Sequence, residues 1–271
     1  MRVAGVGLLT GWGEGLAALP AHARRAAGSR SLIPLAAPPL GGERFRRATR
    51  ECLFGVTAVY ALLREAGLGS EAIAGGDTAL IYVTAGGYGA SNRAFIEAAA
   101  SAGRESGGAL YFPYTAPSAI PAEVTIEFGL RGPYVILIGG AAATIEALGQ
   151  ADRMLAEGTC ARALVLAVET FAECADLYAR GRWLVEWPLV EAAACALLLP
   201  GGNGMMAGPA ERASPLEEAV RRRVGETLAC APLIGLALAC AAGDDPWELT
   251  GQWRGRRLAL RGERSPAGPR R

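Results

Sequence analysis

Cysteine and histidine, which could act as nucleophiles or metal ligands, are few in this chain of 271 residues, and they lie far apart. Six cysteines are scattered singly, mostly inside apolar stretches, at Cys52, Cys160, Cys174, Cys195, Cys230 and Cys240. None forms a Cys-x-x-Cys pair, so we expect buried, reduced thiols in a cytoplasmic protein rather than a zinc site or a redox dithiol. The single histidine, His22, lies in a segment rich in alanine and arginine, and we expect it at the surface or in a linker. One histidine excludes most histidine-dependent catalysis, and we expect neither a metal nor a cofactor.

The other candidates for chemistry have simpler structural explanations. Cys160 follows the expected end of a helix, where the dipole disfavours a thiolate, and Cys195 lies within an apolar run. Ser91 follows the glycine-rich residues 86–89 but lacks the Gly-x-Ser-x-Gly pattern, so we expect it to cap a helix. Glu169 ends an apolar stretch and is the least poor choice for a general base.

A glycine-rich loop near the start of the chain invites a comparison with dinucleotide-binding loops. It runs through Gly5, Gly7, Gly11 and Gly13. The third glycine comes one residue later than in Gly-x-Gly-x-x-Gly, Trp12 crowds the turn, and no acidic residue follows about 20 positions on. We expect a structural loop, and a nucleotide-binding oxidoreductase is the weaker alternative.

The composition is that of a globular protein. Hydrophobic residues make up 51% and charged residues 20% of the chain, and 27 basic against 26 acidic residues give a net charge of +1. This balance argues against a nucleic-acid surface. No apolar run reaches the roughly 18 residues of a membrane span without a charge or a turn, and residues 224–242 are interrupted by Glu226 and Pro232. Residues 3–9 form an apolar run of strand length rather than a signal peptide.

Apolar periodicity predicts strands that alternate with helices. We expect strands over residues 3–9, 78–84, 134–138, 163–168, 190–199 and 253–260. We expect helices over residues 46–66, 91–102, 118–128 and 142–157, and two helical pieces around Pro232 within 215–242. Residues 20–43 are expected to be irregular and 261–271 to fray. Such alternation is typical of an α/β layered domain with a mixed or parallel central sheet.

The segment from Arg131 to Glu169 resembles the nucleophile segment of β-ketoacyl synthases. In that family a Gly-Pro pair, here Gly132-Pro133, opens an apolar strand, and a cysteine lies in the small-residue turn where the next helix begins. A second strand then ends near a glutamate. The family's cysteine falls at Ala141, whose methyl group cannot become a thiolate, so we expect no acyl-enzyme there.

The resemblance covers roughly residues 1–200 in order. Further motifs lie at residues 3–10, 47–50, 65–68, 121–133 and 191–199. The family's second half carries two histidines that bind the malonyl thioester, and the segment after Pro200 contains none. The resemblance therefore implies a thiolase-like layered α/β fold. We expect a ketosynthase N-terminal-like domain over 1–200 and a truncated C-terminal segment, 201–271, packed on the same domain.

A ketosynthase relative without the cysteine resembles a chain-length factor, as in aryl-polyene-type systems. The resemblance implies a non-catalytic subunit that forms a heterodimer with an active ketosynthase in type II fatty-acid or polyketide synthesis, and that meets acyl carrier protein indirectly. The strand expected to pair across the dimer axis is Tyr134, Val135, Ile136, Leu137 and Ile138. The candidates for lining an acyl tunnel are Tyr111, Phe112, Tyr114, Gly140, Ala141 and Ala142. The small residues 139–143 could instead simply let helix and sheet pack closely.

The sequence is also compatible with three other functions and with one further contact surface. The chain could be a malonyl-thioester decarboxylase or acyltransferase that needs no cysteine, the oxidoreductase considered above, or a homodimeric scaffold. The arginines at 24–25, 44–50 and 221–223 are expected on solvated faces, although some could meet an acidic carrier protein.

Overall fold

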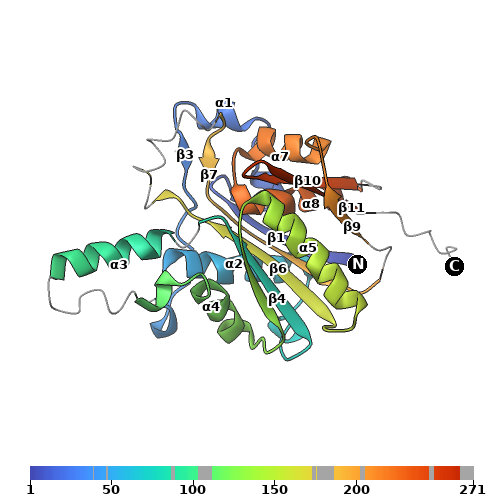
Figure 1. The fold of residues 1–271 in the computed structure, drawn as a ribbon. Coiled ribbons are helices and arrows are strands. Elements are labelled where there is room, and N and C mark those ends of the chain that lie inside the picture. Colours follow the sequence, from blue (N-terminus) through green and yellow to red (C-terminus); the bar gives the residue numbers. More distant parts are fainter. Residues whose placement is uncertain are drawn as a thin grey trace, which may run out of the picture.

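A six-stranded mixed β-sheet lies at the centre of the molecule, with helices on both of its faces (Figure 1). The computed structural model describes residues 1–38, 40–46, 48–86, 89–102, 112–172, 175, 186–201, 205–243 and 247–262. The sheet order is β2-β1-β8-β6-β4-β5. Its strands are β1 (Arg2–Thr10), β2 (Gly13–Glu14), β4 (Thr78–Thr84), β5 (Tyr134–Ile138), β6 (Arg162–Glu169) and β8 (Ala192–Leu199). The strands β4, β5 and β6 run parallel, whereas β8 is antiparallel to both β6 and β1.

The three central strands are apolar over almost their whole length because both faces of the sheet are covered. Every residue of β4 is buried, as are nearly all residues of β6 and β8. Parallel strands that carry helices on both sides read as continuous hydrophobic runs for this reason. The layered α/β fold with a mixed central sheet, expected from the sequence, is the fold that the structure has.

Two helices cover one face of the sheet. They are α2 (Arg50–Ala66) and α4 (Ala119–Phe128), and each is followed by a glycine in the left-handed region, Gly67 and Gly129. The helix α2 packs so closely on β1 that a Cβ atom on Gly7 would lie 2.1 Å from the backbone nitrogen of Leu62. The glycines of the first strand therefore serve helix packing.

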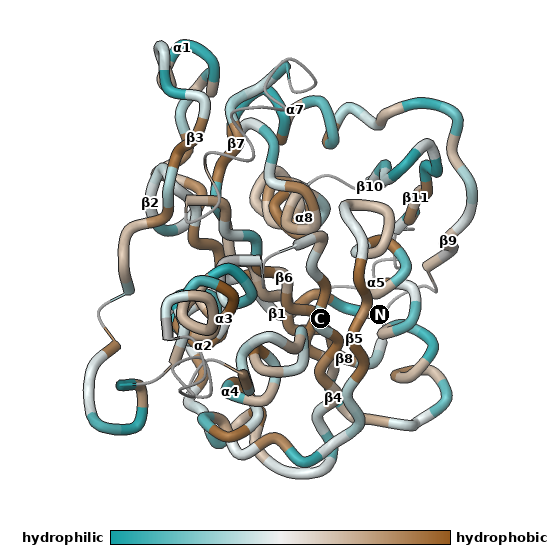
Figure 2. The backbone as a smooth tube through the Cα atoms, turned by 60° about the vertical axis from the view of Figure 1, so that its left-hand side comes forward, coloured by the Kyte–Doolittle hydropathy of each residue, from teal (hydrophilic) through white to brown (hydrophobic). Residues whose placement is uncertain are grey.

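The opposite face is covered by α5 (Ala141–Ala156) and α8 (Ala231–Ala242). A second sheet of three strands lies beyond α5, in the order β10-β11-β9. Its strands are β9 (Met206–Pro209), β10 (Trp247–Trp253) and β11 (Arg256–Gly262). The helix α7 (Pro215–Val224) packs on α8 and begins at Ser214, whose hydroxyl accepts a hydrogen bond from the backbone N–H of Glu217. The hydropathy colouring shows the central strands and α8 as the most apolar parts of the chain (Figure 2).

The remaining elements complete the described chain. They are α1 (Ala23–Ala27), β3 (Leu32–Ile33), α3 (Gly89–Ala102), β7 (Leu189–Val190), and the 3-10 turns η1 (Leu16–Ala18), η2 (Glu43–Phe45), η3 (Ser70–Ala72), η4 (Phe112–Thr115) and η7 (Leu228–Cys230). The strand β3 pairs with β7, so the segment 20–43 is more regular than expected. Among the described residues no helix combines the length and apolarity needed to cross a membrane.

The sequence-based boundaries were wrong mainly after residue 200. The strand expected over 253–260 is a hairpin of β10 and β11, with the turn at Arg254 and Gly255. The helical break within 215–242 lies at Gly225, whereas Pro232 occupies the first turn of α8, where a missing N–H is tolerated. The first long helix begins at Arg50 rather than at residue 46.

Candidate functional site

The turn between β5 and α5 holds Ala141 at the first position of the helix. The N–H of Gly139 donates to the carbonyl of Thr84 on β4 (2.8 Å), and the N–H of Ala143 donates to the carbonyl of Gly140 (3.0 Å). The helix thus begins at the carboxyl edge of the parallel strands, where α/β proteins commonly bind ligands.

The strand β10 packs directly on this turn. A Cβ atom on Gly140 would lie 2.3 Å from Cε3 of Trp253, and one on Gly251 would lie 2.5 Å from the carbonyl carbon of Ala141. The space beside Gly140 is therefore filled by an indole ring of the same chain. At this residue, the geometry supports close packing as the reason for the small side chain.

A cavity of about 260 Å³ remains beside Ala141. Its polar wall is formed by Glu217, Arg221, Glu226, Gln252 and Arg254. No cysteine, serine or histidine is among the described residues that line it. The cavity therefore offers carboxyl and guanidinium groups but no nucleophile of the kind that forms acyl-enzymes.

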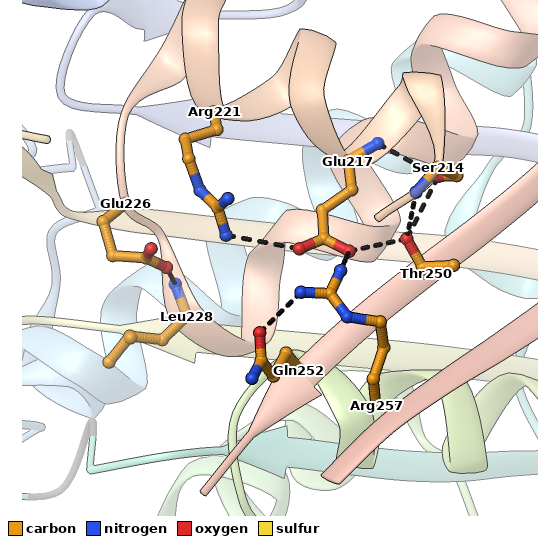
Figure 3. Close-up of polar contacts among 8 residues, drawn as sticks. All are labelled: Ser214, Glu217, Arg221, Glu226, Leu228, Thr250, Gln252 and Arg257. Atoms are coloured by element: carbon orange, nitrogen blue, oxygen red, sulfur yellow. Dashed lines mark hydrogen bonds and ion pairs between the residues drawn. The ribbon is translucent and has the colours of Figure 1, made fainter. Parts of the chain in front are cut away.

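The Glu217 carboxylate forms ion pairs with Arg221 and Arg257 within a polar network that connects α7 to the second sheet (Figure 3). It accepts hydrogen bonds from Arg257 (2.6 Å), Thr250 (2.5 Å) and Arg221 (3.2 Å). The backbone N–H of Ser214 donates to Thr250 at 2.7 Å. Since its partners belong to three elements, Glu217 has a structural role in the cavity wall.

Glu226 is the cavity residue best suited to proton transfer. Burial raises the pKa of its carboxyl group, although the N–H of Leu228 donates to it at 3.1 Å and favours the charged form. Leu228 has a left-handed backbone with φ 46°, which is uncommon for leucine. The sequence pointed to Glu226 only as an interruption of an apolar run.

Burial leaves the described cysteines without thiolate character. Cys52, Cys160, Cys195 and Cys230 are buried, as expected, whereas Cys240 is exposed. Burial raises the pKa of Cys52 to about 12 and also raises the pKa values of Cys160, Cys195 and Cys230. Cys174 lies outside the described residues. None of these buried thiols lines the cavity beside Ala141.

Glu169 cannot serve as a base for a substrate, because its side chain has no access to solvent. It ends β6, and one carboxyl oxygen accepts the backbone N–H of Ala85 at 2.6 Å. The other oxygen has no hydrogen-bond partner among the described residues. Burial raises the pKa of this carboxyl group to about 8, and the charge of Glu169 contributes to the raised pKa of Cys230.

An ion pair between Arg50 and the buried Glu191, next to the start of β8, was not predicted from the sequence. Arg50 donates to both carboxylate oxygens of Glu191, at 2.6 and 2.9 Å, so this arginine is not part of a solvated face. The backbone N–H groups of Leu35, Phe171 and Ala172 also donate to this carboxylate. Burial alone would raise the pKa of Glu191, but these five donors outweigh it and lower the pKa. An acidic residue inside an otherwise apolar run was the available signal.

Two further expectations differ from the structure. Ser91 is not a helix cap: it lies inside α3, and its N–H and hydroxyl donate to the buried Glu51 carboxylate, both at 3.2 Å. His22 is half-buried beside Trp187, with ring centroids 5.5 Å apart.

The glycine loop after β1 leads into β2 and a three-residue 3-10 turn rather than into an α-helix. A pyrophosphate site needs that helix.

The tunnel candidates do not gather in one place. Phe112 is 63% exposed on η4, and Tyr114 is half-buried there. Ala142 is buried in α5, next to the cavity residue Ala141. Tyr111 lies outside the described residues. The strand β5 forms one edge of the large sheet, as a pairing strand requires.

Comparisons with known proteins agree with this architecture. The model of the family "Beta-ketoacyl synthase, N-terminal domain" matches residues 38–209. A search of curated proteins found no match. Among solved structures, a β-ketoacyl synthase from Burkholderia phymatum is similar with a TM-score of 0.73 and 14% identity over 97% of this chain and 98% of that one.

Two complexes are similar at the same sequence identity. The ketosynthase AntDE in complex with the type II polyketide acyl carrier protein AntF gives a TM-score of 0.80 at 14% identity, over 97% of this chain and 98% of that one. The ketosynthase ApeO with its chain length factor ApeC, from Xenorhabdus doucetiae, gives 0.64 at 14% identity over the same shares. Because 97% of this chain is covered, the likeness in fold extends beyond residue 209, where the family match ends.

Proposed function

Because the chain belongs to the β-ketoacyl synthase N-terminal domain family and carries a methyl group where that family has its nucleophile, we propose that it is a non-catalytic, chain-length-factor-like subunit. Its partner would be an active ketosynthase of a type II fatty-acid or polyketide system. The observation that carries the proposal is the cavity beside Ala141, which no described cysteine or histidine lines. Condensation needs a thiolate and donors for the thioester enolate, and the partner would supply both.

The outer edge of β5, which pairs with none of the described strands, supports pairing with a partner strand. The carbonyl of Pro133 accepts from Leu80, and the N–H of Gly139 donates to Thr84, so these odd-numbered residues face β4. Backbone groups alternate along a strand, so the N–H and C=O groups of Tyr134, Ile136 and Ile138 point outward. An antiparallel partner strand centred opposite Ile136 would satisfy all of these outward groups.

Side-chain exposure on β5 agrees with burial in an assembly. Tyr134 is 56% and Ile138 is 59% exposed, although both are large and apolar. The strand carries no charge and no proline, the usual features by which edge strands resist association. This strand would therefore join the two subunits into one continuous sheet.

This chain would contribute residues to the acyl tunnel of its partner rather than form a tunnel of its own. In this chain, Trp253 covers Gly140, and the remaining cavity of about 260 Å³ has a polar wall. Such a wall suits a long acyl chain poorly. Exposed aromatic groups such as Phe112, which lie away from this cavity, are the better candidates to limit the partner's chain length.

A second candidate function, malonyl-thioester decarboxylation without a cysteine, draws on one observation. Glu226 lines the cavity beside Ala141, and its raised pKa would let it hand a proton to an enolate left by loss of carbon dioxide. Release of carbon dioxide from malonyl-thioester by the purified chain, abolished in Glu226→Gln, would favour this function over the first.

Labelling and co-purification test the main proposal together. A ketosynthase-directed mechanism-based inhibitor should label a co-expressed, cysteine-containing ketosynthase and leave this chain unmodified by intact mass. Co-expression should yield a one-to-one complex. Stoichiometric labelling of this chain, or turnover by this chain alone, would refute the non-catalytic assignment.

A further inference from the structure

The cavity beside Ala141 brings together polar groups from two parts of the chain. Arg221 belongs to α7 and Glu226 to the segment between α7 and η7, whereas Gln252 belongs to β10 and Arg254 to the hairpin turn that follows. The volume of about 260 Å³ is slightly below the roughly 300–1,000 Å³ of typical small-molecule sites, so the cavity can hold a small ligand.

Two of the lining residues have an unusual backbone conformation. Leu228 and Arg254, with φ 46° and 47°, are the non-glycine residues of the described chain whose backbones lie in the left-handed region. Glycine, asparagine and aspartate adopt that region most readily. Strained residues persist where the surrounding structure holds them, and they cluster at ligand sites. The presence of both residues in one cavity therefore points to a binding site.

The Glu217 carboxylate in the cavity wall is already occupied by its own partners. One oxygen accepts a hydrogen bond from Arg221, and the other accepts from Thr250 and Arg257 (Figure 3). Both oxygens are therefore engaged, and Glu217 is a poor counterion for a further cation at this cavity.

Arg254 is a cation of the cavity that has no counterion in the described chain. It forms no ion pair with a described residue, and its guanidinium group lies 5.7 Å from the ring centroid of Trp253. Burial raises the pKa of Glu226 and so disfavours the carboxylate form that could pair with this arginine. Arg254 therefore leaves the cavity with an excess of positive charge, which suits an anionic ligand.

Gln252 supplies a neutral donor on the same hairpin. Its carboxamide oxygen accepts a hydrogen bond from Arg257 at 2.5 Å, so its amide N–H groups are left to donate to a ligand. A guanidinium and an amide together match the two oxygens of a carboxylate. A phosphate, with a charge of roughly −1.5 to −2, suits the cavity less well, because the carboxyl groups of Glu217 and Glu226 lie in the same wall.

The apolar part of the lining suits a short alkyl chain. It is formed by Ala141, Val220, Leu228, Ala231 and Trp253. Each CH₂ group that such a surface buries strengthens binding roughly fourfold. The chain must be short, because the whole cavity measures about 260 Å³.

We propose that the cavity beside Ala141 binds a small carboxylate with a short alkyl tail. Arg254 and Gln252 bind the carboxylate, and Val220 and Leu228 contact the tail. The ligand thereby connects the β10 hairpin to α7 and η7. The inference goes beyond the proposed function, since this site needs neither a partner subunit nor a catalytic step.

Titration of the full chain with small probes, followed by NMR of the probe, tests the ligand class. Hexanoate should bind roughly tenfold or more tightly than hexanamide, which has nearly the same shape without the charge. Hexanoate should also bind more tightly than acetate, which lacks the tail, and roughly tenfold more tightly than inorganic phosphate.

Two arginine variants test the position of the site. Arg254→Gln removes the charge and keeps a hydrogen-bond donor, and it should weaken hexanoate binding roughly tenfold or more. Arg222→Gln is the matched control, because Arg222 is exposed on α7 beside Arg221 but does not line the cavity, and it should leave hexanoate binding unchanged. Circular dichroism should show that both variants keep the fold, since both side chains are exposed.

Each contrary outcome overturns a defined part of the proposal. Equal binding of hexanoate and hexanamide, or phosphate binding as tight as that of hexanoate, would overturn the carboxylate assignment. Equal binding of hexanoate and acetate would overturn the contact with the tail. Wild-type affinity in Arg254→Gln, or no binding of hexanoate by the wild type, would overturn the site itself. Pairing with a ketosynthase is measured separately, so a failure of this site and a failure of the proposed function remain distinguishable.

Discussion

Glu169 allows a buried carboxyl group to be tested through the pH dependence of stability. Burial raises its pKa from 4.5 to about 8, so the folded protein keeps this proton where the unfolded chain releases it. From the unfolded to the folded pKa, each pH unit lowers the free energy of unfolding by about 1.4 kcal/mol. The stabilising contribution is complete below the unfolded pKa and is lost as the pH rises through the folded one. The whole shift corresponds to at most about 5 kcal/mol.

Replacing Glu169 by glutamine keeps an oxygen that can accept the Ala85 N–H and removes the ionisable group. We expect urea unfolding, followed by circular dichroism from pH 5 to pH 9, to show a variant close to wild type at the acid end. At the alkaline end the variant should be more stable by several kcal/mol. Glu191→Gln is the control, because the pKa of Glu191 is lowered and its contribution is lost only below this range, as the pH falls through the folded pKa; its difference from wild type should stay constant from pH 5 to pH 9. A difference between Glu169→Gln and wild type that stays constant across this range would refute the reasoning.

Three further predictions concern the site, the interface and the core. Ala141→Cys should not give condensing activity in a malonyl-thioester assay, because no described histidine lines the cavity beside it. Ile136→Pro should keep the monomer folded, since the N–H of Ile136 points outward, but should abolish pairing with the partner subunit in native mass spectrometry. Val135→Pro is the control that removes a hydrogen bond to β4, and it should lower the free energy of unfolding by about 3 kcal/mol or more in thermal unfolding. Arg50→Met leaves Glu191 buried without its cation and should cost about 3–5 kcal/mol in urea unfolding.

The first 200 residues were predictable because their signals are local. The strand β5 has the bounds expected from its apolar run, as does β4, because each is a short apolar run bounded by turn residues. Gly67 and Gly129 end helices through their own left-handed backbones, which needs no knowledge of the fold. The helix α5 begins at Ala141, one residue before the start expected from the sequence.

The second sheet was harder to predict because its signals conflict. The hairpin turn of β10 and β11 places Arg254 in the left-handed region, with φ 47°, next to Gly255. Asparagine or aspartate before glycine would have marked that turn, whereas arginine does not. The run from Trp253 onward therefore read as one strand that crossed the turn. Pro232 similarly read as a break, although the first turn of a helix accepts proline.

The candidate site shows why one residue's identity is not enough to judge an active centre. Ala141 could be assigned from its neighbours, but Trp253 and Glu226 reach it only through the packing of the second sheet and η7. Contacts across such sequence separations depend on register and side-chain volume, which the local pattern does not record.

The missing thiol at position 141 and the filled space beside it both argue against condensation at this site. The indole of Trp253 lies where a Cβ on Gly140 would be, and the backbone of Ala141 touches Gly251, so β10 occupies the approach to the helix start. A cysteine at position 141 would gain a sulfur but would still face the same strand. Restoring condensation would therefore require Trp253 to be made small and proton-handling groups to be added, in addition to the thiol. The double variant Ala141→Cys and Trp253→Ala should admit an inhibitor to the thiol that the single variant excludes; equal labelling of both by intact mass would show that β10 does not close the site.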